Sequence, residues 1–251
     1  PTGSGKTTTM YGILKILNKT DVKIITLEDP VEYKMEGVSQ SQIDKSKDYT
    51  FARGLKSILR QDPDIAMVGE IRDLETAEIA VQAALTGHLI LSTIHTNNAA
   101  GAIPRFLSMG VKPFLLAPAL NCVIGQRLVR LVCKKCKEEI KLSGEQEERV
   151  EDIIAGMPEA AKEEAKNKEL KFYQGKGCEA CGGIGYKGRT GIHEVFVITP
   201  EIEQMILSGK VSEYEMEKIA IKDGMVTMVQ DGVLKAMDGI TTLEEIFRVI
   251  E

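Results

Sequence analysis

Aromatic residues are scarce in this sequence. It has no tryptophan, and its six phenylalanines and six tyrosines make up only 5% of 251 residues. Proteins that bind single-stranded nucleic acid stack bases on aromatic side chains in a basic groove. The sequence has no basic-aromatic stripe, and its formal net charge is −5. These absences argue against nucleic acid as a partner and against a nucleic-acid translocase.

Long hydrophobic runs are also missing. A membrane-spanning helix needs about 20 consecutive apolar residues. The stretch PFLLAPALNCVIG is shorter and is interrupted by Pro118. We therefore expect no transmembrane segment. The contents of hydrophobic residues (43%) and charged residues (27%) are ordinary for a soluble protein, and the length allows one large core and a smaller one.

The first residues, PTGSGKT, lack an initiator methionine and the first glycine of the phosphate-loop pattern G-x-x-x-x-G-K-[ST]. In this pattern, glycines let backbone N–H groups surround phosphate oxygens, the lysine reaches the β- and γ-phosphates, and the hydroxyl binds Mg²⁺. Such a loop follows a buried strand, so we interpret the sequence as part of a longer protein and expect weak or absent hydrolysis from this chain alone. The residues expected to bind ATP and Mg²⁺ are Thr2, Gly3, Ser4, Gly5, Lys6, Thr7 and Thr8.

Strand and helix patterns alternate over the next hundred residues. Apolar runs rich in β-branched residues predict strands in VKIITLEDP, DIAMVGE and HLILSTIH. Helices are expected at 6–18, after Thr50 as N-cap with Pro63 as the stop, and in LETAEIAVQAALTG, which Gly87 closes. Runs that are apolar on both faces fit a parallel sheet covered by helices. The pattern predicts an α/β domain of the RecA type.

Carboxylates follow two of these predicted strands. LEDPVE places Glu28, Asp29 and Glu32 after the first run, and MVGE places Glu70 after the second. ATP hydrolysis needs such groups near the γ-phosphate, to bind metal or to orient water. His95, in the polar cluster STIHTN, is expected to sense the γ-phosphate. His88 remains open between a structural and a functional role.

Four of the five cysteines form two C-x-x-C pairs, Cys133 with Cys136 and Cys178 with Cys181. Paired motifs of this kind predict a closed, structural Zn²⁺ site. The basic residues Lys134, Lys135 and Lys137 would offset its negative charge. Cys122 is expected to be a buried, inert thiol in a helix-like stretch. His193-Glu194 lacks a second histidine four residues later, so it is not a metalloprotease motif, and we assign His193 no role.

The remaining sequence is expected to be mostly helical. The segment 143–168, which contains Pro158, predicts a pair of solvent-exposed helices. After Cys181 we expect strand interrupted by glycines. Thr199 should cap a helix that has Pro200 at its first position and Gly209 after its end. Two capping boxes are expected, Ser212 with Glu215 and Thr241 with Glu244. We predict three domains: a RecA-like core at 1–132, a tetracysteine zinc module at 133–182 with an acidic insertion at 143–168, and a strand-plus-helix subdomain at 183–251.

Several motifs together resemble the secretion ATPase superfamily, and within it the group that powers type II secretion and type IV pilus assembly, often called general secretion pathway protein E. They are PTGSGKTTT, ITLEDPVEY, ILRQDPDIAMVGEIRDLETAEIAVQAALTGHLILSTIHTN, QRLVRLVCKKC and GYKGRTGIHEV. The resemblance implies a homo-hexamer at the cytoplasmic face of the inner membrane, peripheral to it. It also implies contacts with an inner-membrane platform protein and cytoplasmic assembly proteins.

The resemblance also implies roles for individual residues. Glu32 falls in the family's aspartate box and would polarise the attacking water, Glu70 matches the Walker B glutamate, and His95 matches the histidine box. Arg53, Lys56 and Arg60 lie where the family places arginines that serve nucleotide sites. Lysine at position 56 cannot make arginine's planar two-pronged contact, so we select Arg60.

Three alternatives remain. A pilus-retraction ATPase shares the catalytic motifs but usually lacks the four cysteines. A RecA-like nucleic-acid translocase would need a more basic surface. A nucleotide-gated structural subunit would bind ATP without turnover, which the pair Glu32 and Glu70 argues against.

Overall fold

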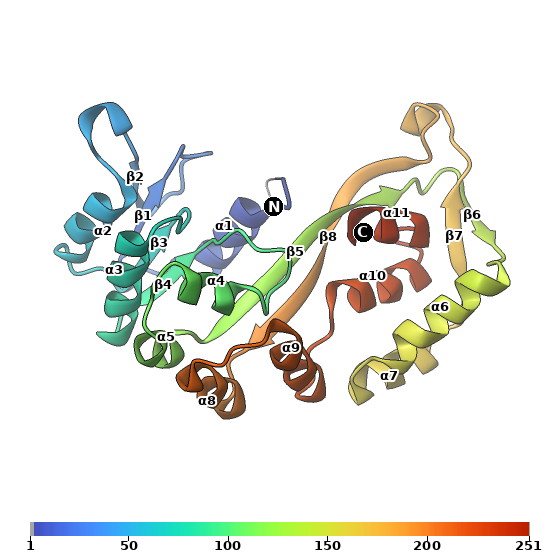
Figure 1. Cartoon of the computed structure of the whole chain (residues 1–251). Helices are drawn as coiled ribbons and strands as arrows, with labels where there is room; N and C mark the ends of the chain where they lie inside the picture. The colour runs from blue at the N-terminus through green and yellow to red at the C-terminus, as the bar shows by residue number, and fades with distance from the viewer. Residues whose placement is uncertain (1–2, 251) are drawn as a thin grey trace.

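The computed structural model describes residues 3–250. Two lobes are joined by a long antiparallel ribbon of β5 (Cys122–Val132) and β8 (Tyr186–Val197) (Figure 1). We call residues 3–121 with 198–225 the sheet lobe, and residues 133–181 with 226–250 the cysteine lobe. None of the helices within 3–250 is long and apolar enough to cross a membrane.

A parallel sheet organises the sheet lobe. Its strands within the described residues lie in the order β2-β1-β3-β4, and each neighbouring pair is parallel. They are β1 (Ile24–Glu28), β2 (Val38–Gln42), β3 (Ile65–Val68) and β4 (Leu89–Ser92). All residues of β1 and β3 are buried, as expected of central strands covered on both faces. The predicted α/β fold with a parallel sheet is confirmed.

Helices cover the two faces of this sheet. On one face, α1 (Lys6–Leu17) packs its buried residues Met10, Tyr11 and Leu14 against Ile24 and Met67. The other face belongs to a larger core that includes residues of α2 (Phe51–Leu59) and α3 (Leu74–Leu85). Alternate residues of β1 and β3 therefore point to different cores.

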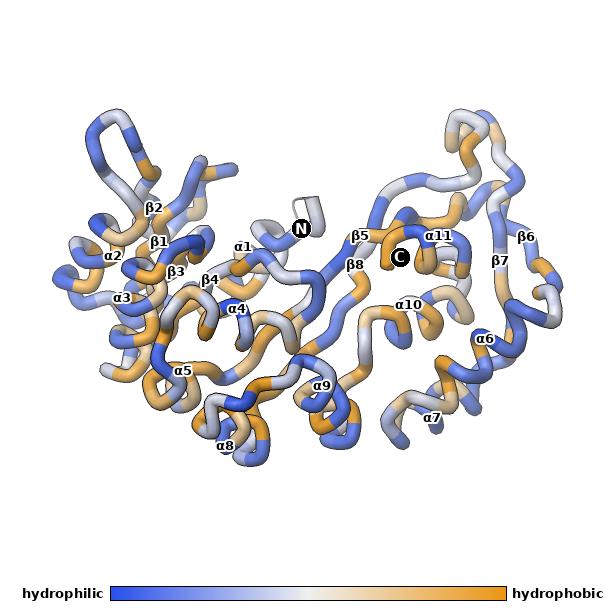
Figure 2. The backbone as a smooth tube through the Cα atoms, in the orientation of Figure 1, coloured by the Kyte–Doolittle hydropathy of each residue, from blue (hydrophilic) through white to orange (hydrophobic). Residues whose placement is uncertain are grey.

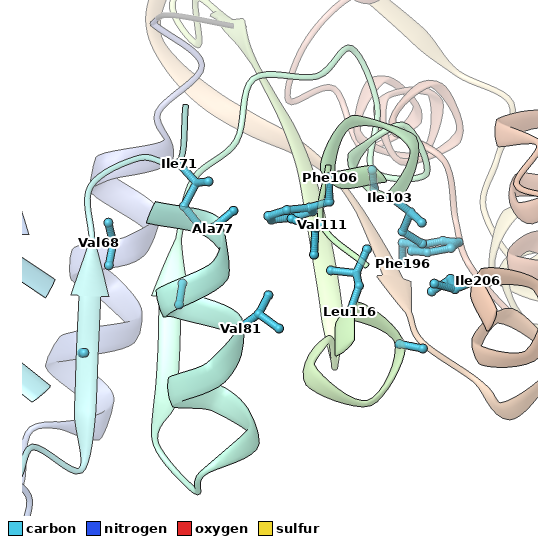
Figure 3. Close-up of a cluster of buried hydrophobic side chains, with 14 of the residues drawn as sticks. Val68, Ile71, Ala77, Val81, Ile103, Phe106, Val111, Leu116, Phe196 and Ile206 are labelled. Carbon is cyan, nitrogen blue, oxygen red and sulfur yellow. The ribbon is translucent and has the colours of Figure 1, made fainter. Parts of the chain in front are cut away.

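The larger core extends beyond the sheet toward the ribbon. Figure 3 shows Val81 of α3, Leu116 and Phe196 following one another across this cluster. Phe196 comes from β8 and Ile206 from a later helix, so the sheet lobe includes chain from both ends of the sequence. The additional helices are α4 (Ala102–Ser108), α5 (Pro113–Ala119), α8 (Pro200–Ser208) and α9 (Glu213–Lys222).

The cysteine lobe has a smaller core. Its strands β6 (Lys137–Ile140) and β7 (Phe172–Gly175) form an antiparallel pair. Val150 of α6 (Gly144–Ala155) and Ala161 of α7 (Glu159–Lys166) are buried with Val233 of α10 (Met228–Met237) and Ile246 of α11 (Leu243–Ile250). The segment 143–168 is thus a helix pair, and Figure 2 shows hydrophilic residues along much of it. One apolar side is nevertheless buried against α10 and α11.

The helix ends can be compared with the caps that the sequence predicts. Thr50 Oγ1 accepts a hydrogen bond from the backbone N–H of Arg53 at 3.3 Å, as predicted. The helix after Thr199 runs from Pro200 to Ser208 and is followed by Gly209 with φ 69°, as predicted. The predicted Thr199 cap is wrong, because the Thr199 hydroxyl donates instead to Asp223 at 3.1 Å and makes no cap hydrogen bond. The predicted box of Thr241 with Glu244 is wrong by one residue. Thr242 accepts the N–H of Glu245 at 3.1 Å, because the Thr241 hydroxyl donates instead to the carbonyl oxygen of Arg130 at 2.8 Å.

Candidate nucleotide site and metal centre

The phosphate-loop residues form the beginning of α1. Gly3 and Gly5 have φ 78° and 86°, and Gly5 caps the helix without a side-chain hydrogen bond. The first turn holds no acidic residue, so its backbone N–H groups suit an anion. Ser4 Oγ is buried and has no hydrogen-bond partner within the described residues. These features fit a bound phosphate; the predicted Thr2 lies outside the described residues.

Lys6 is the first residue of α1 and lies between charges of both signs. Burial lowers the pKa of its ammonium group, the neighbouring Arg127 lowers it further, and Glu70 raises it. Lys6 and Glu70, 64 positions apart in sequence, are therefore close enough to interact electrostatically. This is the meeting of phosphate loop and carboxylate that the sequence predicts.

Glu70 follows β3 and is mostly buried. Its Oε2 lies 2.6 Å from Arg72 Nε and 3.4 Å from Nε2 of His95. The hydrogen bond to Glu70 raises the pKa of Arg72. Thr93 fixes the two strand ends, since its hydroxyl donates to the carbonyl oxygen of Gly69 at 2.7 Å and its own carbonyl oxygen accepts the N–H of Ile71 at 2.9 Å. Glu70 and His95 are thus held together at the carboxyl edge of the sheet.

The acids after β1 have different environments. Glu28 is buried, whereas Asp29 and Glu32 are exposed. Asp29 lies 3.3 Å from Lys45 Nζ. Glu32 is attached to α1 through its backbone N–H, which donates to the Tyr11 hydroxyl at 3.4 Å. Glu32 therefore reaches the vicinity of α1 with its carboxylate open to solvent.

The cysteine lobe brings four sulfur atoms together. The Sγ atoms of Cys133, Cys136, Cys178 and Cys181 all lie within 4.8 Å of one another. Cys133 and Cys178 are separated by 3.9 Å, as are Cys136 and Cys181. A tetrahedral Zn²⁺ with Zn–S bonds of about 2.3 Å places its sulfurs about 3.8 Å apart. The donor set and its dimensions fit structural zinc.

Backbone N–H groups donate hydrogen bonds to one sulfur of this cluster. The N–H groups of Cys178 and Gly185 point to the sulfur of Cys181 at 3.2 and 3.3 Å. The backbone bond from Cys178 lowers the pKa of the Cys181 thiol to about 6; burial acts in the opposite direction, and the bond from Gly185 adds to the lowering. Such N–H groups stabilise the thiolate that a metal requires.

Comparison with known proteins identifies the family. The model of the Type II/IV secretion system protein family matches residues 1–248. The chain belongs to this family.

Curated family members are similar over the whole chain. The type IV pilus assembly ATPase PilB of Thermus thermophilus is 51% identical over 252 residues, which covers 100% of this chain and 27% of PilB. The type II secretion system protein E of Aeromonas hydrophila is 49% identical, covering 99% of this chain and 47% of its own. The type II secretion system ATPase E of Vibrio cholerae is 47% identical with the same coverage. The chain thus spans half or less of these relatives' length.

Solved structures share the fold. The pilus retraction motor PilT, solved with bound ADP, matches with a TM-score of 0.64 and 28% identity, covering 99% of this chain and 58% of PilT. The Legionella pneumophila ATPase DotB matches with a TM-score of 0.66 and 22% identity, covering 98% of this chain and 57% of its own.

The other predicted basic residues of this family member lie on α2 or at its end. Arg60 directly follows α2 as its C-cap and is exposed. It precedes β3, whereas Glu70 follows it, and four strand residues separate these edges by about 13 Å. Arg53 is paired with Asp48 at 2.5 Å, and Lys56 with Glu75 at 2.7 Å.

Two histidines have structural positions. His88 Nδ1 lies 3.0 Å from the carbonyl oxygen of Ala83 at the end of α3, which favours its structural role. The backbone N–H of His193 donates to Asp231 at 2.8 Å, and burial lowers the pKa of its imidazole.

The structure corrects the prediction for Cys122 and gives the contacts of Lys137. Cys122 is exposed. It begins β5 opposite Val197, because α5 has already ended at Ala119. The Nζ of Lys137 donates to the carbonyl oxygen of Gly239 at 3.2 Å and lies 4.3 Å from the centre of the Tyr173 ring.

Gln126 is a site residue that sequence reasoning missed. Its Nε2 donates to the carbonyl oxygen of Ser4 at 2.8 Å, and its Oε1 accepts from the Thr9 hydroxyl at 2.6 Å. A Cβ atom on Gly5 would lie 2.7 Å from the same Nε2. The ribbon therefore holds the phosphate loop in place. The only sequence signal for this contact is the position of Gln126 in QRLVRLVCKKC.

Proposed function

We propose that this chain is the ATP-hydrolysing part of a motor subunit for type II protein secretion or type IV pilus assembly. The observation that carries the proposal is the grouping at the start of α1. Glu70 contacts His95 and interacts electrostatically with Lys6. Lys6 begins the helix whose glycine-containing N-terminus presents backbone N–H groups suited to phosphate. Membership of the secretion family supplies the system in which ATP would be used.

The roles of individual residues follow from this arrangement. Lys6 binds the β- and γ-phosphates, and Thr7 holds Mg²⁺, which neutralises phosphate charge when bound. Glu70 acts on the metal side of the site and His95 senses the γ-phosphate. Glu32 polarises the attacking water, and its exposed carboxylate can accept a proton. The four cysteines hold Zn²⁺ as a structural ion.

Arg60 acts on the nucleotide of a neighbouring subunit. Its exposure and its distance from Glu70 within one chain support an action in trans rather than in cis. An arginine supplied in trans is worth about 10³–10⁵ in rate. The motor is a hexamer on the cytoplasmic face of the inner membrane, where it drives a platform protein to assemble pilin-like subunits.

The alternative is a pilus-retraction ATPase, which the similarity to PilT favours. The sulfur cluster favours the assembly and secretion group instead, because the family resemblance associates it with those members. Extension or retraction of pili by cells that carry the natural protein distinguishes the two.

The experiment compares Glu70→Gln with the parent in the natural protein that contains this chain. We expect Mg²⁺-dependent phosphate release to fall to background in the variant while nucleotide still binds. Glu148→Gln is the control, because Glu148 is an exposed carboxylate of α6 in the cysteine lobe, and it should retain turnover. Undiminished turnover in Glu70→Gln would overturn the proposal. The isolated 251-residue chain is expected to hydrolyse ATP weakly or not at all.

A further inference from the structure

Glu28, the last residue of β1, has a buried carboxylate whose hydrogen-bond donors are neutral side chains. Glu28 is 3% exposed and Tyr11 is 1% exposed. The Tyr11 hydroxyl donates to Oε2 of Glu28, while Oε1 accepts from the Thr26 hydroxyl at 2.6 Å and from Gln40 Nε2 at 3.2 Å. Neither Glu28 nor Tyr11 has a role in the proposed reaction.

Tyr11 is a constant donor in this network. Burial, and next the hydrogen bond to Glu28, raise the pKa of its phenol to about 12. The hydroxyl therefore stays protonated at neutral pH and directs its hydrogen to Glu28. The lone pairs of its oxygen remain available as acceptors. One of them receives the backbone N–H of Glu32 at 3.4 Å.

The loop that carries Glu32 is fixed at several further points. Gln40 Nε2 donates to the carbonyl oxygen of Tyr33 at 3.1 Å, and Gln40 Oε1 accepts the N–H of Met35 at 2.7 Å. The ring of Tyr33 meets that of Tyr11 edge-on, with centroids 4.6 Å apart. These contacts orient the loop on β2 and on α1.

Tyr11 joins this loop to the phosphate-binding end of α1. Lys6 and Tyr11 belong to the same 12-residue helix, about one and a half turns apart. The hydrogen bond at the Tyr11 hydroxyl therefore attaches the Glu32 backbone to the same helix that the phosphate loop begins. Glu28 fixes the direction of that hydroxyl.

We propose that Tyr11, oriented by Glu28, is a positioning residue that sets the placement of Glu32 relative to the phosphate loop. The inference rests on the proposed function, because it concerns the carboxylate assigned to water activation. Tyr11 does not touch the reacting atoms, and it acts through the amide of Glu32.

Tyr11→Phe and Thr26→Val in the natural protein separate positioning from simple support of the core. Each variant removes one hydroxyl donor from Glu28 and keeps the side-chain shape, but only Tyr11→Phe also removes the acceptor for the Glu32 N–H. We expect Tyr11→Phe to lower kcat for ATP by about 10–100-fold, the scale of a misplacement near 1 Å, with KM and nucleotide affinity unchanged. Thr26→Val should keep kcat within about twofold of the parent. Equal losses of kcat in the two variants would overturn the proposal.

A double-mutant cycle with Glu32→Gln tests whether Tyr11 acts through Glu32. If it does, Tyr11→Phe lowers the residual rate of Glu32→Gln by less than twofold; independent, multiplicative losses would refute the positioning role. An unchanged rate in Glu32→Gln alone would instead refute the assignment of Glu32 in the proposed function. Gln40→Leu, which loosens the same loop from β2, covers the case in which Tyr11→Phe does not fold. It should show the same loss of kcat at constant KM, and a normal kcat would count against the proposal.

Discussion

The two lobes are stabilised in different ways. In the sheet lobe, central strands are buried on both faces between helices, and the larger core continues through many contiguous apolar residues. The cysteine lobe has a smaller core, four clustered sulfurs and a buried carboxylate, Glu245, bound by two arginines. The sheet lobe is therefore stabilised mainly by burial of apolar surface, and we expect the cysteine lobe, with its smaller core, to rely more on polar contacts and on the proposed zinc.

Removing the sulfurs that we propose bind zinc should have the largest effect. Structural zinc contributes on the order of 10–16 kcal/mol to the folding of small modules. In Cys181→Ser, or after chelation of the parent, we expect hydrogen exchange to lose protection in β6 and β7 while β1 and β3 stay protected. Cys122→Ser is the matched control, because Cys122 is exposed and begins β5, at the opposite end of that strand from Cys133. Uniform loss of protection over both lobes would show that the two lobes are not stabilised in different ways.

Phe196→Ala tests whether the sheet lobe truly extends into β8. Phe196 is 0% exposed and belongs to the larger core although it follows the cysteines in sequence. Truncation of a buried phenylalanine costs about 3–5 kcal/mol. We expect denaturant unfolding of the sheet lobe to shift by this amount while the metal content stays constant. Val195→Ala, a half-exposed neighbour on the same strand, should have little effect. Loss of zinc in Phe196→Ala would show that the lobes do not behave separately.

Glu245→Gln tests the polar support of the cysteine lobe. Glu245 is 0% exposed and accepts bonds from Arg130 Nε at 2.8 Å and Arg248 Nε at 2.8 Å. Removing one charge of a buried pair costs about 3–5 kcal/mol. We expect a loss toward the lower end of that range, because glutamine keeps an acceptor oxygen.

The pH dependence of that loss has a defined sign. Burial alone would raise the pKa of Glu245, but hydrogen bonds from Arg248 and Arg130 outweigh it and lower the pKa to about 2. The stabilisation is therefore complete above the unfolded glutamate pKa of about 4.3 and is lost as pH falls toward 2. The difference in unfolding free energy between parent and Glu245→Gln should shrink over this interval. Release of metal at low pH affects both proteins, so a constant difference would contradict the assignment.

The comparison also shows what the sequence could predict. The helix start at Lys6, the buried strands and the position of Glu70 follow from local patterns, because a phosphate loop and β-branched runs specify their own conformation. The cysteine spacing likewise predicted a cluster before its geometry was known. In each case the residues that matter are close in sequence or chemically rare.

The unpredicted features depend on contacts between distant segments. Gln126 binds Ser4 across 122 positions, and no local pattern marks it. Glu194, next to the histidine considered for a protease motif, accepts the N–H groups of Ala99 at 2.6 Å and Met228 at 3.3 Å. Thr241 resembles a helix cap as well as Thr242 does, and only the nearby carbonyl of Arg130 decides between them.

The smallest effects should come from one helix cap in each lobe. Thr50 caps α2 by accepting the N–H of Arg53 at 3.3 Å, and Thr227 caps α10 by accepting the N–H of Gln230 at 3.4 Å. Replacing such a cap by alanine costs about 1 kcal/mol. Thr50→Ala should therefore lower hydrogen-exchange protection in the sheet lobe alone, and Thr227→Ala in the cysteine lobe alone. The parent protein measured at matched pH and zinc provides the reference. Both changes are small and local, so the lobe that loses protection shows how independently the two lobes open. Equal loss of protection in both lobes from either variant would mean that the β5–β8 ribbon joins them into one cooperative unit.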